Sequence, residues 1–150
     1  MQLRELITID IDVAPIVDLG DAGTGVRRLI PFDGGTFTGR DGLSGTVAPG
    51  GADWQFVRAD GVIEIDAHYV LQTGDGALIE VRSTGIRVAS PEVVARITAG
   101  EPVDASEYYF RTHIRLSTAD EALGWLNDRL AVSAGERRRS SVRIDVFELT

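Results

Sequence analysis

The sequence contains no cysteine, and this absence excludes several classes of site at once. A chain without thiols forms no disulfides, no cysteine-ligated zinc sites and no iron–sulfur clusters, and it has no cysteine nucleophile. Histidine is almost as scarce, because only His68 and His113 are present, so a three-histidine zinc site is excluded as well. We therefore expect no metal site.

Long apolar runs and an excess of positive charge are also missing. No stretch approaches the ~18 apolar residues of a membrane span, and residues 1–6 do not resemble the apolar centre of an export signal. Fifteen Lys and Arg residues against 23 Asp and Glu residues give a formal net charge of −8, which repels nucleic acids and anionic membranes. We expect a cytoplasmic protein with no nucleic-acid partner and no membrane association.

Motifs for nucleotide cofactors and for a serine nucleophile are absent too. The glycines fit neither the Walker loop nor the dinucleotide-binding fingerprint, and no Gly-x-Ser-x-Gly elbow occurs. The glycine pairs in Asp33–Gly35 and Pro49–Trp54 are typical of turns. Any chemistry is therefore expected to proceed without a cofactor.

The chain does have the composition of one globular domain over residues 1–150, with 43% hydrophobic and 25% charged residues. Its 17 glycines separate short segments in which apolar and polar residues alternate, and Ile7–Val13 is the clearest of them. An all-β domain with two short helices, closed into an antiparallel barrel, is therefore predicted. The predicted strands cover about residues 7–13, 26–32, 35–38, 43–47, 53–58, 62–73, 77–88, 107–116 and 142–149.

Two segments have helical signals. Ser90 and Pro91 begin a predicted helix that ends before Gly100. A second helix is predicted from the capping-box spacing of Thr118–Glu121 to about Val132. Both helices are expected to plug or cover the barrel, whereas the basic run 137–139 is interpreted as a solvated hairpin loop.

The hairpin of residues 62–88 holds the most informative pattern. A three-residue loop, Gly74–Gly76, would place Asp66 opposite Thr84 and His68 opposite Arg82, whereas a two-residue turn would shift the register by one. Alternate polar residues then share a single face of the hairpin. The polar set comprises Glu64, Asp66, His68, Glu80, Arg82 and Thr84.

Two interpretations of this polar set remain open. Polar residues commonly face water in antiparallel sheets, and Ile63, Ile65 and their odd-numbered neighbours would then fill the interior. Alternatively, the polar set faces inward, where Val70 and Ile86 beside it would form the apolar part of a ligand cavity. His113 lies on the same predicted strand face as Arg111 and Arg115, so it is expected to face solvent.

Several segments resemble one family over nearly the whole chain. They are Pro31–Gly39, Leu43–Val47, Gly50–Gln55, Asp60–Gly61, Ile65–Tyr69, Asp75–Ile79, Gly85–Arg87, Tyr109–Thr112 and Trp125–Asn127. In order and content they are similar to domain-of-unknown-function family 3237. The resemblance implies a single-domain, lipocalin-like closed barrel with a central cavity, and it favours cavity roles for residues of the shared motifs: Asp53, Asp66, Tyr69 and Arg82. The family commonly has Arg where this chain has His68, which departs from the pattern.

These patterns suggest a cofactor-independent enzyme that binds a small, partly apolar carbonyl or polyketide-like metabolite. The expected reaction is a proton transfer, such as an isomerisation, a cyclisation or an elimination. Asp66 or Asp53 would be the general base, and Arg82 would stabilise the developing oxyanion. The side chains expected to bind substrate are Trp54, Glu64, His68, Tyr69, Glu80, Thr84, Tyr108, Thr112 and Trp125.

Two other classes of function fit the same sequence. A carrier or sensor of a small hydrophobic ligand needs an apolar cavity but no base. A self-associating structural protein would instead have a barrel filled by its own side chains. A homodimer is also compatible with any of these functions.

Overall fold

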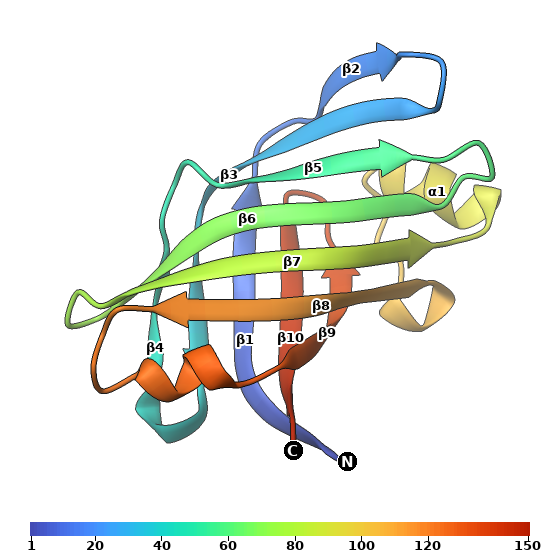
Figure 1. Cartoon of the computed structure of the whole chain (residues 1–150). Coiled ribbons are helices and arrows are strands. Elements are labelled where there is room, and N and C mark those ends of the chain that lie inside the picture. Colours follow the sequence, from blue (N-terminus) through green and yellow to red (C-terminus); the bar gives the residue numbers. More distant parts are fainter.

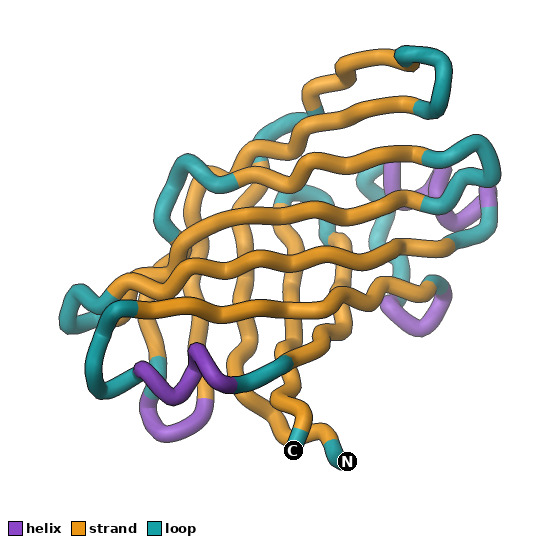
Figure 2. Tube along the Cα trace, in the orientation of Figure 1, coloured by secondary structure: helices purple, strands orange, loops and turns teal.

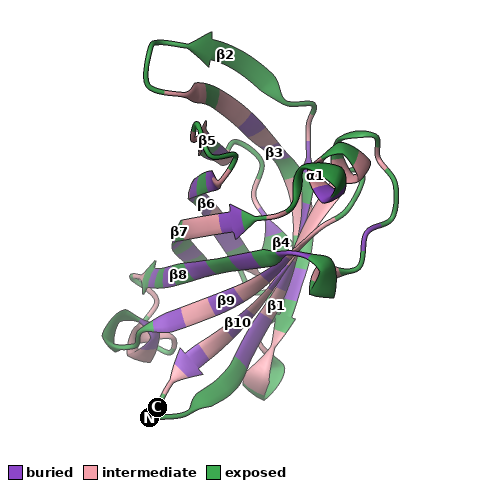
Figure 3. Ribbon diagram, turned by 90° about the vertical axis from the view of Figure 1, so that its right-hand side faces the viewer, coloured by how far each residue is buried: buried purple, intermediate pink, exposed green.

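Buried and exposed residues alternate along nearly every strand (Figure 3). In β6 (Ile63–Thr73), each odd-numbered residue from Ile63 to Leu71 is buried, as expected for a strand with one face in a core and one face in water. The computed structural model describes all residues, 1–150. The other strands are β1 (Leu3–Val13), β2 (Val17–Asp21), β3 (Val26–Gly39), β4 (Ser44–Val47), β5 (Ala52–Val57), β7 (Leu78–Val88), β8 (Tyr109–Thr118), β9 (Ala131–Arg137) and β10 (Ser141–Leu149).

The strands form one closed antiparallel barrel (Figure 1). Going round it, the order is β1, β10, β9, β8, β7, β6, then β4 and β5 at one position, and β3, which pairs with β1 and closes the ring of eight. The two termini lie side by side, because Gln2 and Thr150 exchange backbone hydrogen bonds of 2.9 and 3.0 Å. The predicted fold class is therefore confirmed.

The glycine pair at 34–35 is a bend within one strand, so the prediction of two strands separated by a turn was wrong. β3 pairs with β5 before the bend, through Val26–Pro31, and with β4 after it, through Thr36–Thr38. The register with β1 also shifts at this point. Glycines at a bend let the strand turn the corner of the barrel without ending it.

Two strands were missed. β2 is an extra strand beside β3, and all of its residues are exposed, so neither face of it belongs to the core. β9 occupies the end of the second predicted helix and the start of the predicted loop. Its residues pair with both β8 and β10, and these two ladders decide the conformation of the segment.

Only one of the two predicted helices is an α-helix, although both segments contain helical residues (Figure 2). α1 (Pro91–Thr98) has the predicted start, because Ser90 Oγ accepts a hydrogen bond from the backbone N–H of Val93. The second predicted helix is reduced to a 3₁₀ turn, Gly124–Asp128. Thr118 does not begin a helix there, since it ends β8 and donates its hydroxyl to the Leu78 carbonyl.

The apolar core lies inside the barrel and contains 26 buried hydrophobic residues. Among its largest fully buried side chains are Phe37, Leu71 and Leu126. The chain forms no helix of the length and hydropathy that a membrane span requires.

Candidate functional site

Several polar side chains lie on the inward face of the barrel among the apolar ones. Asp53 and Gln55 alternate with exposed or half-buried neighbours on β5, and Ser83 and Arg87 follow Ile79 and Val81 on the inward face of β7. Thr112 of β8 and Ser133 of β9 belong to the same inward set, whereas the remaining buried polar residue, Glu148, is paired with Arg40 and Arg129. Burying a polar group lowers the stability of the fold unless the group has a hydrogen-bond partner or a ligand. We therefore take this set as the candidate site.

Asp53 is held rigidly. It is 7% exposed, its Oδ2 accepts from Gln55 Nε2 at 2.8 Å, and its Oδ1 accepts from the backbone N–H of Asp66 at 3.0 Å. Arg28 Nη2 in turn donates to Gln55 Oε1 at 2.6 Å. The chain of contacts from Arg28 through Gln55 fixes both the position and the orientation of the carboxylate.

A row of hydroxyls crosses three neighbouring strands next to this network. Ser83 Oγ donates to Thr112 Oγ1 at 2.8 Å, and Thr112 and Ser133 share a hydrogen bond of 2.6 Å. Gly85 gives the row its space, because a Cβ there would overlap the side chain of Thr112 and the backbone beside it. The row therefore satisfies its own polar atoms.

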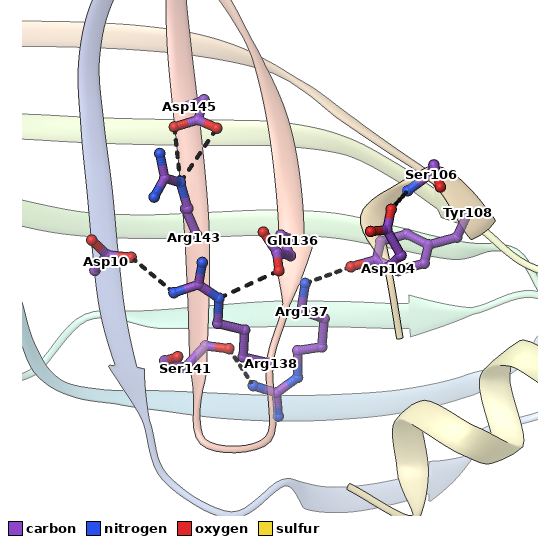
Figure 4. Close-up of polar contacts among 10 residues, drawn as sticks. All are labelled: Asp10, Asp104, Ser106, Tyr108, Glu136, Arg137, Arg138, Ser141, Arg143 and Asp145. Atoms are coloured by element: carbon purple, nitrogen blue, oxygen red, sulfur yellow. Dashed lines mark hydrogen bonds and ion pairs between the residues drawn. The ribbon is translucent and has the colours of Figure 1, made fainter. Parts of the chain in front are cut away.

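Three arginines, Arg28, Arg87 and Arg137, converge at the end of the barrel next to α1. Burial lowers the pKa of Arg87 to about 10, and the positive charges of Arg28 and Arg137 contribute to this lowering. Arg137 is positioned by its backbone N–H, which donates to Tyr108 Oη at 2.9 Å, and by Nη1, which donates to the Ser141 carbonyl (Figure 4). All three remain cationic at neutral pH.

Two spaces share Arg87 and Arg137 in their walls. The inner cavity has a volume of about 30 Å³, room for about two water molecules, and Asp53 and Arg87 both line it. The outer space, which we call the arginine vestibule, has a volume of about 350 Å³. Its walls carry Arg28, Arg87, Arg137 and Arg139 together with the apolar side chains of Ile16, Ile30 and Ile97. A ligand of modest size therefore has room in the vestibule with one small group directed toward Asp53.

The hairpin of β6 and β7 has the register of the three-residue loop, one of the two predicted alternatives, but it presents its polar set outward. Thr73 and Ala77 close the three-residue loop, Asp66 pairs with Thr84, and His68 pairs with Arg82. The interior-facing interpretation is nevertheless wrong, because the side chains of Asp66 and Arg82 are 48% and 54% exposed. Glu64, His68, Glu80 and Thr84 lie on the same outer face.

Four side chains of the outer set form two pairs. Arg82 Nε donates to Asp66 Oδ1 at 3.2 Å, and His68 Nε2 lies 2.6 Å from Glu80 Oε2. His113 is exposed, as predicted. No three His, Asp or Glu side chains are grouped so that they could hold a metal ion.

The remaining predicted residues divide between the site and its surroundings. Asp53, Tyr69, Tyr108 and Thr112 are buried in the barrel, and the Tyr69 ring packs edge-on against Phe32 with 5.2 Å between centroids. Trp54 is half exposed on the outside of β5. Trp125 lies at the other end of the barrel, where the Arg40 guanidinium sits 5.5 Å from its ring centroid. Neither tryptophan lines the inner cavity or the vestibule.

Arg28, Gln55, Arg87 and Arg137 were missed. The signal was present for Arg87 and Arg28, since each has the parity of the buried residues on its strand: Val81 and Ile79 on β7, Ile30 and Phe32 on β3. A charged residue at an apolar position of a strand is the pattern to search for. Arg137 gave no such signal, because β9 itself was not predicted.

The pH dependence of stability tests the environment of Asp53. Burial raises the pKa of its carboxyl above 3.8 and outweighs the hydrogen bonds from Gln55 and Asp66. Its contribution to the free energy of unfolding is therefore complete below pH 3.8 and is lost as the pH rises through the raised value. We expect the wild type to lose stability relative to Asp53→Asn across this range in urea unfolding. A stability difference that does not change with pH would contradict the raised pKa.

Comparisons with known proteins agree with the fold. The family model described as "Protein of unknown function (DUF3237)" matches residues 1–149. A UPF0311 protein from Rhodopseudomonas palustris is 38% identical over 149 residues, which cover 99% of this chain and 97% of that protein. A solved structure of a conserved protein of unknown function from the same species has a TM-score of 0.95 at 38% identity, with coverage of 99% and 97%.

A more distant structure has the same fold. It is described as an enzyme from Penicillium herquei, with a TM-score of 0.74 and 23% identity over 99% of this chain and 94% of that one. At this identity the likeness shows the fold alone. With the family model covering almost every residue and similar relatives matching end to end, the chain belongs to the DUF3237 family.

Proposed function

We propose that the protein is a cofactor-independent enzyme that binds a small, partly apolar carbonyl compound, such as a polyketide-like metabolite, and catalyses proton transfer. The reaction would be an isomerisation, a cyclisation or an elimination. The observation that supports this proposal is Asp53, a buried carboxylate fixed by two hydrogen bonds at a cavity with apolar walls. Of the two candidate bases, only Asp53 is retained, because Asp66 lies on the outer face.

The chemistry requires a base and a positive field. Asp53 would accept a proton from the carbon next to the carbonyl, and the electron pair of the broken C–H bond would move to the carbonyl oxygen as an enolate. Burial raises the pKa of Asp53, which makes it a stronger base near neutral pH. The positive charge of the vestibule arginines would stabilise the enolate, in place of Arg82.

The comparison with the Penicillium herquei enzyme is compatible with this proposal. It indicates that a barrel of this shape can carry an enzyme, but fold alone does not transfer an activity. The proposed chemistry therefore depends on Asp53 and the arginines.

A carrier of small ligands is the second candidate. The size of the inner cavity favours it, because a volume of about 30 Å³ leaves the body of a ligand in the vestibule, where it can be held without reacting. The carrier would release its ligand chemically unchanged.

Deuterium exchange distinguishes the two functions. In D₂O with a panel of cyclic 1,3-diketones and aryl ketones, we expect the wild type to accelerate deuterium incorporation next to the carbonyl, measured by NMR. Asp66→Asn, which changes an exposed carboxylate on the outer face, is expected to react like the wild type. Compounds that bind but are recovered without exchange or conversion would favour the carrier and contradict the enzyme.

A further inference from the structure

The arginine vestibule holds more positive charge than the protein neutralises. Asp53 acts electrostatically on all three arginines, and Asp18 acts only on Arg28. None of the ion pairs in the structure includes Arg28, Arg87 or Arg137. In a chain of net charge −8, this concentration of cations is a local exception.

Arg87 is the least satisfied of the three. It is 7% exposed, and its Nε is buried without a hydrogen-bond partner. The Nε of Arg28 is also buried without a partner, although Arg28 Nη2 donates to Gln55. Nε and a neighbouring Nη form the edge of a guanidinium that binds a carboxylate through two parallel hydrogen bonds. Both arginines therefore have this edge incompletely used.

The walls around this charge are apolar. Ile16, Ile30 and Ile97 line the vestibule beside the arginines, and Ile30 also lines the inner cavity together with Arg87. Apolar surface next to a cationic cluster matches an organic anion with an apolar body better than it matches an inorganic ion.

We propose that the arginine vestibule binds the carboxylate of an organic acid with an apolar body, through the Nε edge of Arg87, with the unpartnered Nε of Arg28 as a further donor. The substrate class of the barrel is thus narrowed to acids that carry a carbonyl group. This narrowing rests on the proposed function, because it places the carbonyl of the same molecule toward Asp53, which shares the inner cavity with Arg87.

Matched acids and amides test the proposal by calorimetry. The probes are phenyl-substituted alkanoic acids of increasing chain length and their primary amides, which keep the apolar body and remove the charge. We expect the wild type to bind at least one acid more tightly than its amide. Arg87→Gln is expected to weaken the binding of that acid by roughly 10- to 100-fold, as for the loss of a charged hydrogen-bonded pair. Arg87→Lys keeps the charge but not the paired donors, so its affinity for the acid should lie between those of the wild type and Arg87→Gln.

Two further variants separate binding from folding. Arg82→Gln, an exposed arginine on the outer face of the same strand, is expected to bind the acid like the wild type. Arg87→Met removes a buried charge that has no ion-pair partner, so it should unfold at the same temperature as the wild type or higher, and it should not bind the acid.

The proposal is overturned if no acid binds better than its amide, if Arg87→Gln binds the acid as tightly as the wild type, or if inorganic sulfate binds as tightly as the acid. Failure of the proposed function gives a different result. Acid selectivity that depends on Arg87, with no deuterium exchange next to the carbonyl of aryl keto acids of the same chain length, would remove the enzyme and retain the acid site. Exchange of neutral ketones without acid selectivity would do the reverse.

Discussion

Asp53→Asn is expected to reduce turnover by about 10²- to 10⁴-fold, the usual contribution of a positioned general base. Asn has nearly the shape of Asp but cannot accept the proton, so the loss should fall on kcat rather than on ligand affinity. The measurement is the rate of deuterium exchange or product formation with a panel compound that the wild type converts.

The control for this variant is Asp66→Asn on the neighbouring strand. Asp66 donates its backbone N–H to Asp53, but its side chain is exposed and paired with Arg82. The activity of Asp66→Asn should therefore equal that of the wild type. Because the Asp53→Asn substitution puts one of the two side-chain hydrogen bonds at this position at risk, thermal unfolding must show that the variant is folded. A folded Asp53→Asn protein with full activity would rule out Asp53 as the base.

Gly35→Ala is expected to lower the free energy of unfolding by about 2–5 kcal/mol, from backbone strain and overpacking together. Gly35 has φ +137°, a conformation that L-residues with a side chain rarely adopt, and an added Cβ would overlap the Asp10 carbonyl oxygen of β1. This contact lies at the bend of β3, where β1 and β3 close the barrel. Urea unfolding of the two proteins measures the loss.

Gly50→Ala separates the two causes. Gly50 also has a positive φ, +102°, but an added Cβ there would have no heavy atom within 4 Å. Its cost should be the strain alone, about 1–3 kcal/mol, and smaller than that of Gly35→Ala. Equal losses in the two variants would show that the close approach of β1 to Gly35 does not contribute.

The alternation of residues on β6 predicted the strand but left open its register with β7 and the face that is buried. Odd-numbered residues such as Ile65 and Leu71 are more apolar than the even-numbered ones, which by itself favours the outward position for Asp66 and its neighbours. The motif resemblance suggested a cavity role for several residues without saying which face of the strand they occupy. A shared motif identifies Asp53 and Asp66 equally, although one side chain points into the barrel and the other into water.

The arginine vestibule could be predicted only in part. Arg87 and Arg28 have the parity of buried residues, which is a local property of β7 and β3. Their proximity to Arg137 is not a local property, because the three arginines come from strands that are distant in the sequence. In addition, β9, which carries Arg137, is a strand only because it pairs with β8 and β10.

The sequence by itself determined the all-β class, most of the strands and the α1 start, and it reduced the hairpin register to two alternatives, because period-two alternation, a helix cap and loop length are local signals. Only the tertiary structure decided which face of each strand is inside, that β3 bends rather than ends, and that three arginines surround the approach to one buried carboxylate. Barrel closure makes these decisions, since it brings together residues from opposite ends of the chain and encloses one face of every strand in the ring.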